Sequence, residues 1–208
     1  MEGDLRRIPL SRRSHVIGFQ PLSTGITEHE SALERDFVTL TRFLDAGATV
    51  TSQPTTIRFQ HAGDRRRYTP DFLVGWSDGR HELIEVKYRA DLYAGWVRFK
   101  PAFAAAREWA HAQGARFRIA TERGIRGSLL DAAKRLLPLR AAPMDLVLAE
   151  EALTIVTTLG SPTFGRIVER LPVTRSAALA VVWQLIARGM LRADLSKPID
   201  IHTRLGTP

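Results

Sequence analysis

The stretch that decides the fold reads YTPDFLVGW over residues 68–76 and HELIEVKY over residues 81–88, with the turn SDG at 77–79 between them. An Asp-Gly turn between two apolar, β-branched runs indicates a β-hairpin. Successive side chains of a strand point to opposite faces, so Glu85 and Lys87 are predicted to project together while Ile84 and Val86 face the core. A tight hairpin also brings Asp71, at the start of its first strand, alongside Glu85.

Charged side chains within strands this apolar need a chemical reason, because burying unpaired charge is expensive. Phosphodiester hydrolysis supplies one, since it needs a hard divalent cation bound by oxygen ligands, here the carboxylates of Asp71 and Glu85 with the Val86 carbonyl. Such a cation polarises the phosphate and lowers the pKa of water. Lys87 then orients or helps to deprotonate the water and offsets charge in the transition state. The competing interpretation is a structural ion pair on an edge strand.

A carboxylate on the preceding helix extends this cluster. Apolar residues recur at helical spacing over residues 29–45, and Glu34 borders the face that they form. We expect Glu34 to be the third acidic ligand, with Glu30, one turn earlier, as its competitor. Asp36 is predicted to point away, as a surface residue or as the partner of an arginine.

The surrounding sequence predicts a mixed α/β core over residues 29–140. A helix, three strands, a helix, a strand and a final helix fit a sheet with helices on both faces. Residues 1–28 are polar and rich in arginine and turn residues, and they are predicted to form an arm with little regular structure. The elements not yet mentioned are expected at 55–60 (strand), 93–112 (helix), 116–120 (strand) and 124–137 (helix).

Residues 141–208 are predicted to form a separate domain. Helical patterns over 144–159, after Pro162 and from Thr174 to Met190 precede a hairpin-like pattern, which is the outline of a winged helix. The last of these helices is mostly Ala, Leu and Val, whereas a winged helix that reads DNA normally carries a basic stripe. We therefore favour a protein partner for this domain over DNA.

Composition and charge narrow the class of protein. The chain has 208 residues, 44% of them hydrophobic, which is typical of a folded protein, and it has no cysteine for disulfides or thiolate chemistry. Its net charge of +8 predicts a polyanionic partner. The run Arg65, Arg66, Arg67 beside the proposed site favours a phosphate clamp over a solvated loop. No signal-peptide pattern and no membrane-length apolar run is present, so a cytoplasmic protein without membrane contact is expected.

Six blocks of sequence carry a resemblance to a known family. In order and spacing, over about residues 12–135, they are similar to the TnsA family, the endonuclease subunit of the heteromeric Tn7-like transposases. The blocks are ESALERDF (30–37), SQPTTIRF (52–59), RRYTPDFLV (66–74), DGRHELIEVKY (78–88), FKPAFAAAREWA (99–110) and FRIATERGIR (117–126). The resemblance implies a restriction-endonuclease-like (PD-(D/E)xK) fold and a Mg²⁺-dependent site, with Mn²⁺ as a substitute. The residues that it places in that site are Glu34, Asp71, Glu85 and Lys87.

The resemblance also implies a division of labour during cut-and-paste transposition. A TnsA-like subunit cuts the 5′ ends of the transposon, the integrase-like transposase TnsB cuts and joins the 3′ ends, and the AAA+ ATPase regulator TnsC contacts the C-terminal region of the TnsA-like subunit. Two features depart from the family: Gly124 stands where a polar residue is usual, and the C-terminal domain is short. The alternatives are a stand-alone restriction or repair nuclease of the same fold and a nuclease-inactive assembly subunit.

Overall fold

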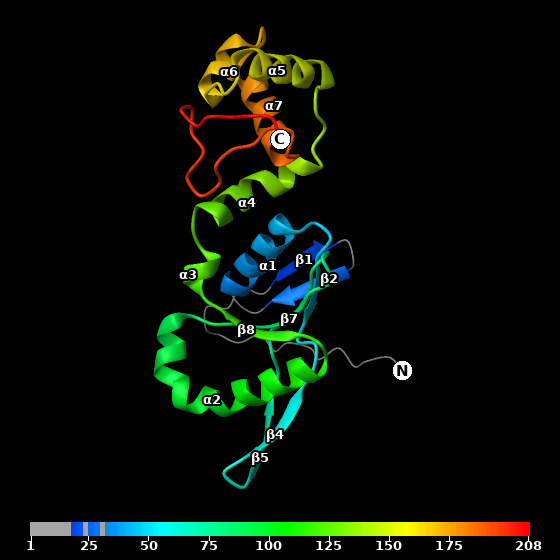
Figure 1. Ribbon diagram of the computed structural model, residues 1–208, viewed down its shortest axis with the longest axis vertical. Helices are drawn as coiled ribbons and strands as arrows, with labels where there is room; N and C mark the ends of the chain where they lie inside the picture. Colours follow the sequence, from blue (N-terminus) through cyan, green and yellow to red (C-terminus); the bar gives the residue numbers. More distant parts are fainter. Residues whose placement is uncertain (1–17, 23–24, 30–31) are drawn as a thin grey trace. The chain divides into compact units, whose positions relative to one another are not determined.

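The computed structural model of the chain describes residues 18–22, 25–29 and 32–208 (Figure 1). Within it the chain divides into two compact units, Met1–Glu122 and Arg123–Pro208. The boundary predicted at residue 140 lies later in the chain than this division. The reason is that helix α4 (Ser128–Arg140), expected in the first domain, packs against helix α7 (Arg175–Ala187) of the second unit.

A four-stranded mixed sheet forms the centre of the first unit, in the order β3-β6-β7-β8. Strand β6 is antiparallel to both β3 and β7, and β8 runs parallel to β7. The hairpin predicted around the SDG turn is present as β6 and β7, with Phe72 opposite Ile84. Strand β7 therefore lies in the middle of the sheet, not at an edge as the ion-pair interpretation assumed. The strands span Thr49–Ser52 (β3), Phe72–Gly75 (β6), His81–Val86 (β7) and Arg116–Ala120 (β8).

Helices cover both faces of this sheet, as the pattern predicted (Figure 1). Helix α1 (Ala32–Leu44) stacks Phe37 on Phe72, with ring centroids 5.6 Å apart. Helix α2 (Arg89–Ala112) buries Phe103 against Leu83 on the opposite face. Strand side chains alternate between faces, so Glu85 and Lys87 share the α2 side with Leu83.

Two further hairpins belong to the first unit. Strands β4 (Ile57–His61) and β5 (Asp64–Tyr68) form a two-stranded ribbon that extends away from the sheet in Figure 1. Strands β1 (Gly18–Leu22) and β2 (Gly25–His29) also pair with each other. The expectation of little regular structure in the arm is therefore wrong for β1 and β2. Two strands that follow each other closely in the sequence can pair through their backbones without a long apolar pattern. Residues 1–17 of the arm, and the competitor Glu30, lie outside the described residues.

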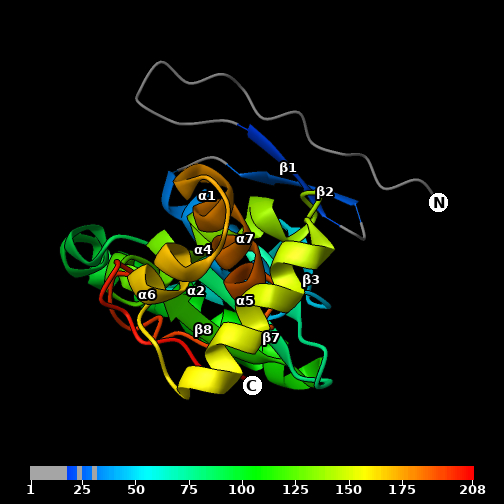
Figure 2. The same ribbon diagram turned by 90° about the horizontal axis from the view of Figure 1, so that it is seen from above.

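Three helices make up most of the second unit, namely α5 (Leu146–Leu159), α6 (Phe164–Arg170) and α7, which Figure 2 shows grouped together. Side chains of Asp145, Thr163 and Thr174 cap their N-termini. The chain after α7 returns along this bundle, and Arg192 and Gly206 exchange backbone hydrogen bonds of 2.8 and 3.1 Å. The short helix α3 (Glu122–Ile125) precedes α4. In the described ranges, no helix is both long and apolar enough to cross a membrane.

Candidate active site

The candidate site lies where β7 ends beside the start of β6. Asp71 immediately precedes β6, and the register of the hairpin places it next to Glu85. Its Oδ2 atom accepts a 2.6 Å hydrogen bond from the Val86 backbone N–H. On the other side, the Asp71 carbonyl accepts a 2.7 Å bond from the N–H of Gln53, whose φ of 45° ends β3. The main chain thus fixes Asp71 from two strands.

Glu85 is held by two side chains that reach its two oxygens separately. Lys87 Nζ lies 2.9 Å from Oε1, and the Tyr68 hydroxyl donates a 2.6 Å hydrogen bond to Oε2. Glu85 is only 5% exposed, so these partners replace the water that a carboxylate would otherwise bind.

Tyr68 is a site residue that the sequence patterns did not single out. It is the last residue of β5, and its ring packs edge-on against Phe103 of α2, with centroids 6.0 Å apart. Burial, followed by the charge and hydrogen bond of Glu85, raises the pKa of the Tyr68 hydroxyl, so it stays a proton donor. The sequence could have indicated this position. Side chains alternate along the strand RRRY (65–68), so Tyr68 points to the face opposite that of Arg67.

The carboxylates of the site interact electrostatically. Burial raises the pKa of Asp71 well above its ordinary value, and the negative charges of Glu85 and then Glu34 raise it further. The Val86 N–H and the Lys87 ammonium act in the opposite direction. Asp71 is thus a carboxyl group whose ionisation is disfavoured unless additional positive charge is present.

Lys87 carries the positive charge of this cluster. Burial alone would lower its pKa, but the carboxylates of Glu85 and then Asp71 outweigh burial, and the pKa of Lys87 is raised. Its ammonium also lies 5.3 Å from the centre of the Phe99 ring on α2. Lys87 is therefore protonated at neutral pH, which suits stabilisation of negative charge better than removal of a proton.

Glu34 reaches the cluster from helix α1. It lies in the first turn of the helix, one turn before Phe37, whose stacking on Phe72 places this end of α1 over β6. Its charge acts on both Asp71 and Lys87. Asp36 is only 3% exposed, so the prediction of a surface position for it was wrong. Residues 36–41 are all buried, which shows that α1 is covered on more than one side.

The donor set fits a hard divalent cation. Over residues 18–22, 25–29 and 32–208, no three His, Asp or Glu side chains converge closely enough to hold a metal by themselves. Mg²⁺ seldom needs such a cage, since one or two carboxylates, water and substrate phosphates suffice. Here the ligands would be Asp71 and Glu85 with the Val86 carbonyl, and Glu34 nearby. The negative charges of Glu85 and Glu34 raise the pKa of Asp71, and a bound cation would relieve this repulsion between carboxylates.

A groove of about 780 Å³ opens beside Lys87, between the β4–β5 ribbon and the first half of α2. Of the three arginines in the predicted phosphate clamp, Arg66 lines this groove. Arg65 and Arg67 alternate with it along β5 and therefore point to the other face of the ribbon. The groove is lined by His61, Arg66, Lys87, Asp91, Ala94, Gly95, Val97, Arg98 and Phe99.

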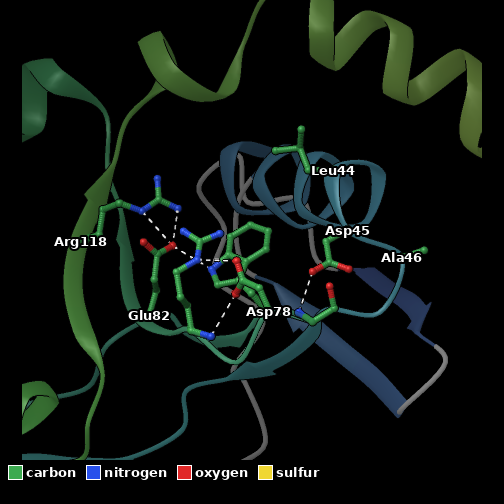
Figure 3. Close-up of a pocket in the computed structure, with 9 residues that line it drawn as sticks. Leu44, Asp45, Ala46, Asp78, Glu82 and Arg118 are labelled. Atoms are coloured by element: carbon green, nitrogen blue, oxygen red, sulfur yellow. Dashed lines mark hydrogen bonds and ion pairs between the residues drawn. The ribbon is translucent and has the colours of Figure 1, made fainter. Parts of the chain in front are cut away.

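A second pocket, at the far end of the sheet, has the features of a structural network (Figure 3). One carboxylate oxygen of Glu82 accepts hydrogen bonds from Trp76 Nε1 at 3.1 Å and from Arg118 Nε at 3.2 Å. Asp45 accepts a 2.8 Å hydrogen bond from the Ser77 N–H, which ties the end of α1 to the β6–β7 turn. These charges are engaged with one another, so we assign this pocket to the scaffold.

The first unit is thus an α/β sheet covered by helices, with carboxylates and a lysine clustered at the ends of two central strands. Residues 48–122 match the family model described as TnsA-like endonuclease N terminal. This match covers about a third of the chain and supports the TnsA-family resemblance seen in the sequence. Asp71, Glu85 and Lys87 lie inside the matched segment, whereas Glu34 and the second unit lie outside it. No curated protein matches the chain.

Proposed function

We propose that this protein is the Mg²⁺-dependent DNA endonuclease subunit of a Tn7-like transposase and cuts the 5′ ends of the transposon. The observation that carries the proposal is the cluster of Asp71, Glu85 and Lys87 within a TnsA-like endonuclease domain. The chemistry of that cluster suits a phosphodiester, which combines a poor leaving group with negative charge. The fold proposed for the first unit is accordingly the restriction-endonuclease-like, PD-(D/E)xK type.

The residues of the site take distinct roles in this proposal. Asp71 and Glu85 hold the cation with the Val86 carbonyl, and Glu34 adds negative charge from α1. Mg²⁺, when bound, supplies positive charge to the phosphate and acidifies water. Lys87 places its ammonium next to the developing charge of the transition state. Tyr68 keeps the Glu85 carboxylate in one orientation, because its hydroxyl engages Oε2.

We further propose that the second unit is a winged-helix-like domain that binds protein partners. Three helices followed by a returning segment are the support, with the bridges Thr163–Arg204 and Arg192–Gly206 in the positions of short strands. Helix α7 carries Arg175 only at its start and is otherwise largely apolar, which disfavours it as a DNA-reading helix. The partner of this unit would be the ATPase TnsC. The whole protein would act with the transposase TnsB on double-stranded DNA at the transposon ends, in the bacterial nucleoid.

The test uses a supercoiled plasmid that carries transposon ends, with Mg²⁺ or Mn²⁺, the partner transposase and the ATPase. Mapped 5′ strand breaks are compared for the wild type, Asp71→Ala and the control Glu108→Ala, an exposed residue of α2 that does not line the groove. We expect breaks at the 5′ ends that disappear only with Asp71→Ala. Persistent 5′ cutting by Asp71→Ala would show that another site or subunit does the chemistry.

The same experiment separates the two alternatives. A stand-alone restriction or repair nuclease would cut specific sites without the other subunits. A nuclease-inactive assembly subunit would be needed for transposition but would tolerate Asp71→Ala. The four residues of the site argue against the second alternative, because an inactive site has no need to bury several carboxylates around one lysine.

A further inference from the structure

The β4–β5 ribbon carries its arginines on two different faces. Opposed residues of an antiparallel pair share a face, and the register pairs Arg58 with Arg67 and Gln60 with Arg65. We call Arg58, Arg65 and Arg67 the arginine face. The other face carries Ile57 and Tyr68, which pack towards α2, and then Arg66 at the groove beside Lys87.

The charges of the arginine face are not balanced by carboxylates in the part of the chain that the structure describes. All three arginines are exposed, and none lies within salt-bridge distance of a carboxylate among the residues that the structure describes. The single acidic residue of the ribbon, Asp64, pairs with Arg66 on the other face at 3.6 Å. Arg58 and Arg67 stand directly opposite each other, and like charges in that position destabilise a strand pair. A polyanionic partner would turn this repulsion into attraction.

We propose that the arginine face is a second DNA-binding surface that contacts the phosphate backbone of duplex DNA outside the catalytic groove. The proposal rests on the endonuclease function proposed above and adds a surface to it. Arg66 then contacts the strand at the catalytic site, while the arginine face holds a neighbouring part of the duplex.

The shape and spacing of the ribbon suit this partner. Arg65 and Arg67 are two residues apart on one strand, about 7 Å, whereas each strand of B-DNA places a phosphate about every 3.4 Å along the axis. The major groove is wide enough for a two-stranded ribbon, and a ribbon with arginines on both faces can lie between its two phosphate walls. Contacts of this kind fix the position of a protein on DNA without reading the sequence.

The experiment compares two double variants of the full chain with the same loss of charge. Arg58→Gln with Arg67→Gln removes the opposed pair of the arginine face. Arg107→Gln with Arg116→Gln, on α2 and at the start of β8, removes two exposed arginines elsewhere in the same unit. Binding to a fluorescein-labelled duplex of mixed sequence is followed by anisotropy in EDTA, at several NaCl concentrations and with unlabelled duplex or single strand as competitor.

We expect the ribbon variant to bind about tenfold more weakly at low salt, with a salt dependence shallower by roughly two phosphate contacts. The control variant should stay within about twofold of the wild type, and duplex should compete better than single strand. The melting temperature of the ribbon variant should not fall, because the substitutions remove a repulsion.

Three outcomes would overturn the proposal: equal binding by the two double variants, better competition by single strand, or a lower melting temperature of the ribbon variant. The proposed nuclease function is judged separately. Asp71→Ala should bind this duplex as the wild type does while failing to cut. If that variant still cut DNA, the proposed nuclease site would be wrong, but the anisotropy result for the arginine face would be unaffected.

Discussion

At the scale of single residues, the site concentrates negative charge in a place with little water. Asp71 and Glu85 meet there, Glu34 adds its charge from α1, and Lys87 supplies positive charge to the cluster. Such an arrangement favours binding of a cation at the expense of the stability of the free protein. The loss of folding stability can be measured, because replacing one of the charged residues by a neutral one should restore part of it.

Asp71→Asn should raise the stability of the metal-free protein by about 0.5–2 kcal/mol at neutral pH. Burial and the neighbouring carboxylates raise the pKa of Asp71 in the folded state above 3.8, its ordinary value. A folded-state pKa above the unfolded value means that stability is fully present below pH 3.8 and is lost as the pH rises through the folded pKa. The neutral amide removes that loss. Urea unfolding at several pH values in EDTA tests this expectation.

The same variant also tests the cation site without any measurement of cutting. Mn²⁺ should raise the melting temperature of the wild type, because a ligand that binds the folded state stabilises it. It should leave Asp71→Asn unchanged. Glu108→Gln, at an exposed position of α2 outside the groove, should respond to Mn²⁺ like the wild type. An equal Mn²⁺ response of the Asp71 variant would place the cation elsewhere.

Tyr68→Phe should weaken Mn²⁺ binding and cutting by about 10–100-fold while keeping the fold. The substitution removes only the hydroxyl that holds Glu85 Oε2, and it retains the ring that packs on Phe103. Calorimetric titration with Mn²⁺ measures the first effect and plasmid nicking the second. Tyr93→Phe is the matched control, since Tyr93 is 72% exposed and accepts its hydrogen bond from Arg89. Unchanged Mn²⁺ affinity in Tyr68→Phe would remove Tyr68 from the site.

Strand alternation explains why part of this site could be predicted from the sequence. The period of two places Glu85 and Lys87 on one face, and the hairpin turn places Asp71 beside them. Tyr68 was not predicted as a site residue because it belongs to a different strand, whose other residues are exposed and charged. Asp36 was placed wrongly because helical spacing identifies one buried face, whereas α1 is covered on more than one side.

At the scale of elements, the two-residue turn of the β4–β5 ribbon contains a local conflict. Ala62 has a φ of 51° and Gly63 a φ of 84°, the left-handed conformation that a tight hairpin turn requires. Glycine adopts it freely, but alanine does so only with strain. The ribbon was only half predicted from the sequence, as one strand, because Ala-Gly is a much weaker turn signal than Asn-Gly.

Ala62→Asn should therefore stabilise the protein by about 0.5–1 kcal/mol, since asparagine tolerates a positive φ better than alanine. Gly63→Ala should destabilise it by about 1 kcal/mol for the opposite reason. Hydrogen exchange of the peptides that cover β4 and β5 reports both effects locally. Slower exchange in Gly63→Ala than in the wild type would contradict this account of the turn.

At the scale of the whole molecule, the chain combines two compact units of different architecture. The first carries the sheet, the ribbon and the candidate site, and the second is a helical bundle with a largely apolar α7. The sequence composition indicated two domains, but it did not locate the boundary between them, which lies after Glu122 and not after residue 140. The helix at 128–140 has a regular amphipathic pattern, and only its buried contacts with α7 show which unit it belongs to.

Leu185→Ala tests whether the two units carry separable functions. Leu185 is fully buried in α7, so its truncation should cost the second unit about 2–5 kcal/mol. Because the ribbon and the Asp71 site belong to the first unit, binding to a duplex in EDTA should stay within about twofold of the wild type. Hydrogen exchange should become faster over residues 123–208 and remain unchanged over the sheet.

Transposition with the complete set of subunits should fall sharply in the same variant if the second unit binds protein partners, because a destabilised bundle cannot present its surface. The matched control is Leu83→Ala, which removes an equally buried leucine from β7. It should accelerate exchange over the sheet and weaken duplex binding and cutting together. If Leu185→Ala instead abolished duplex binding while exchange over the sheet stayed unchanged, the second unit would itself hold DNA, and its proposed role as a protein-binding domain would be wrong.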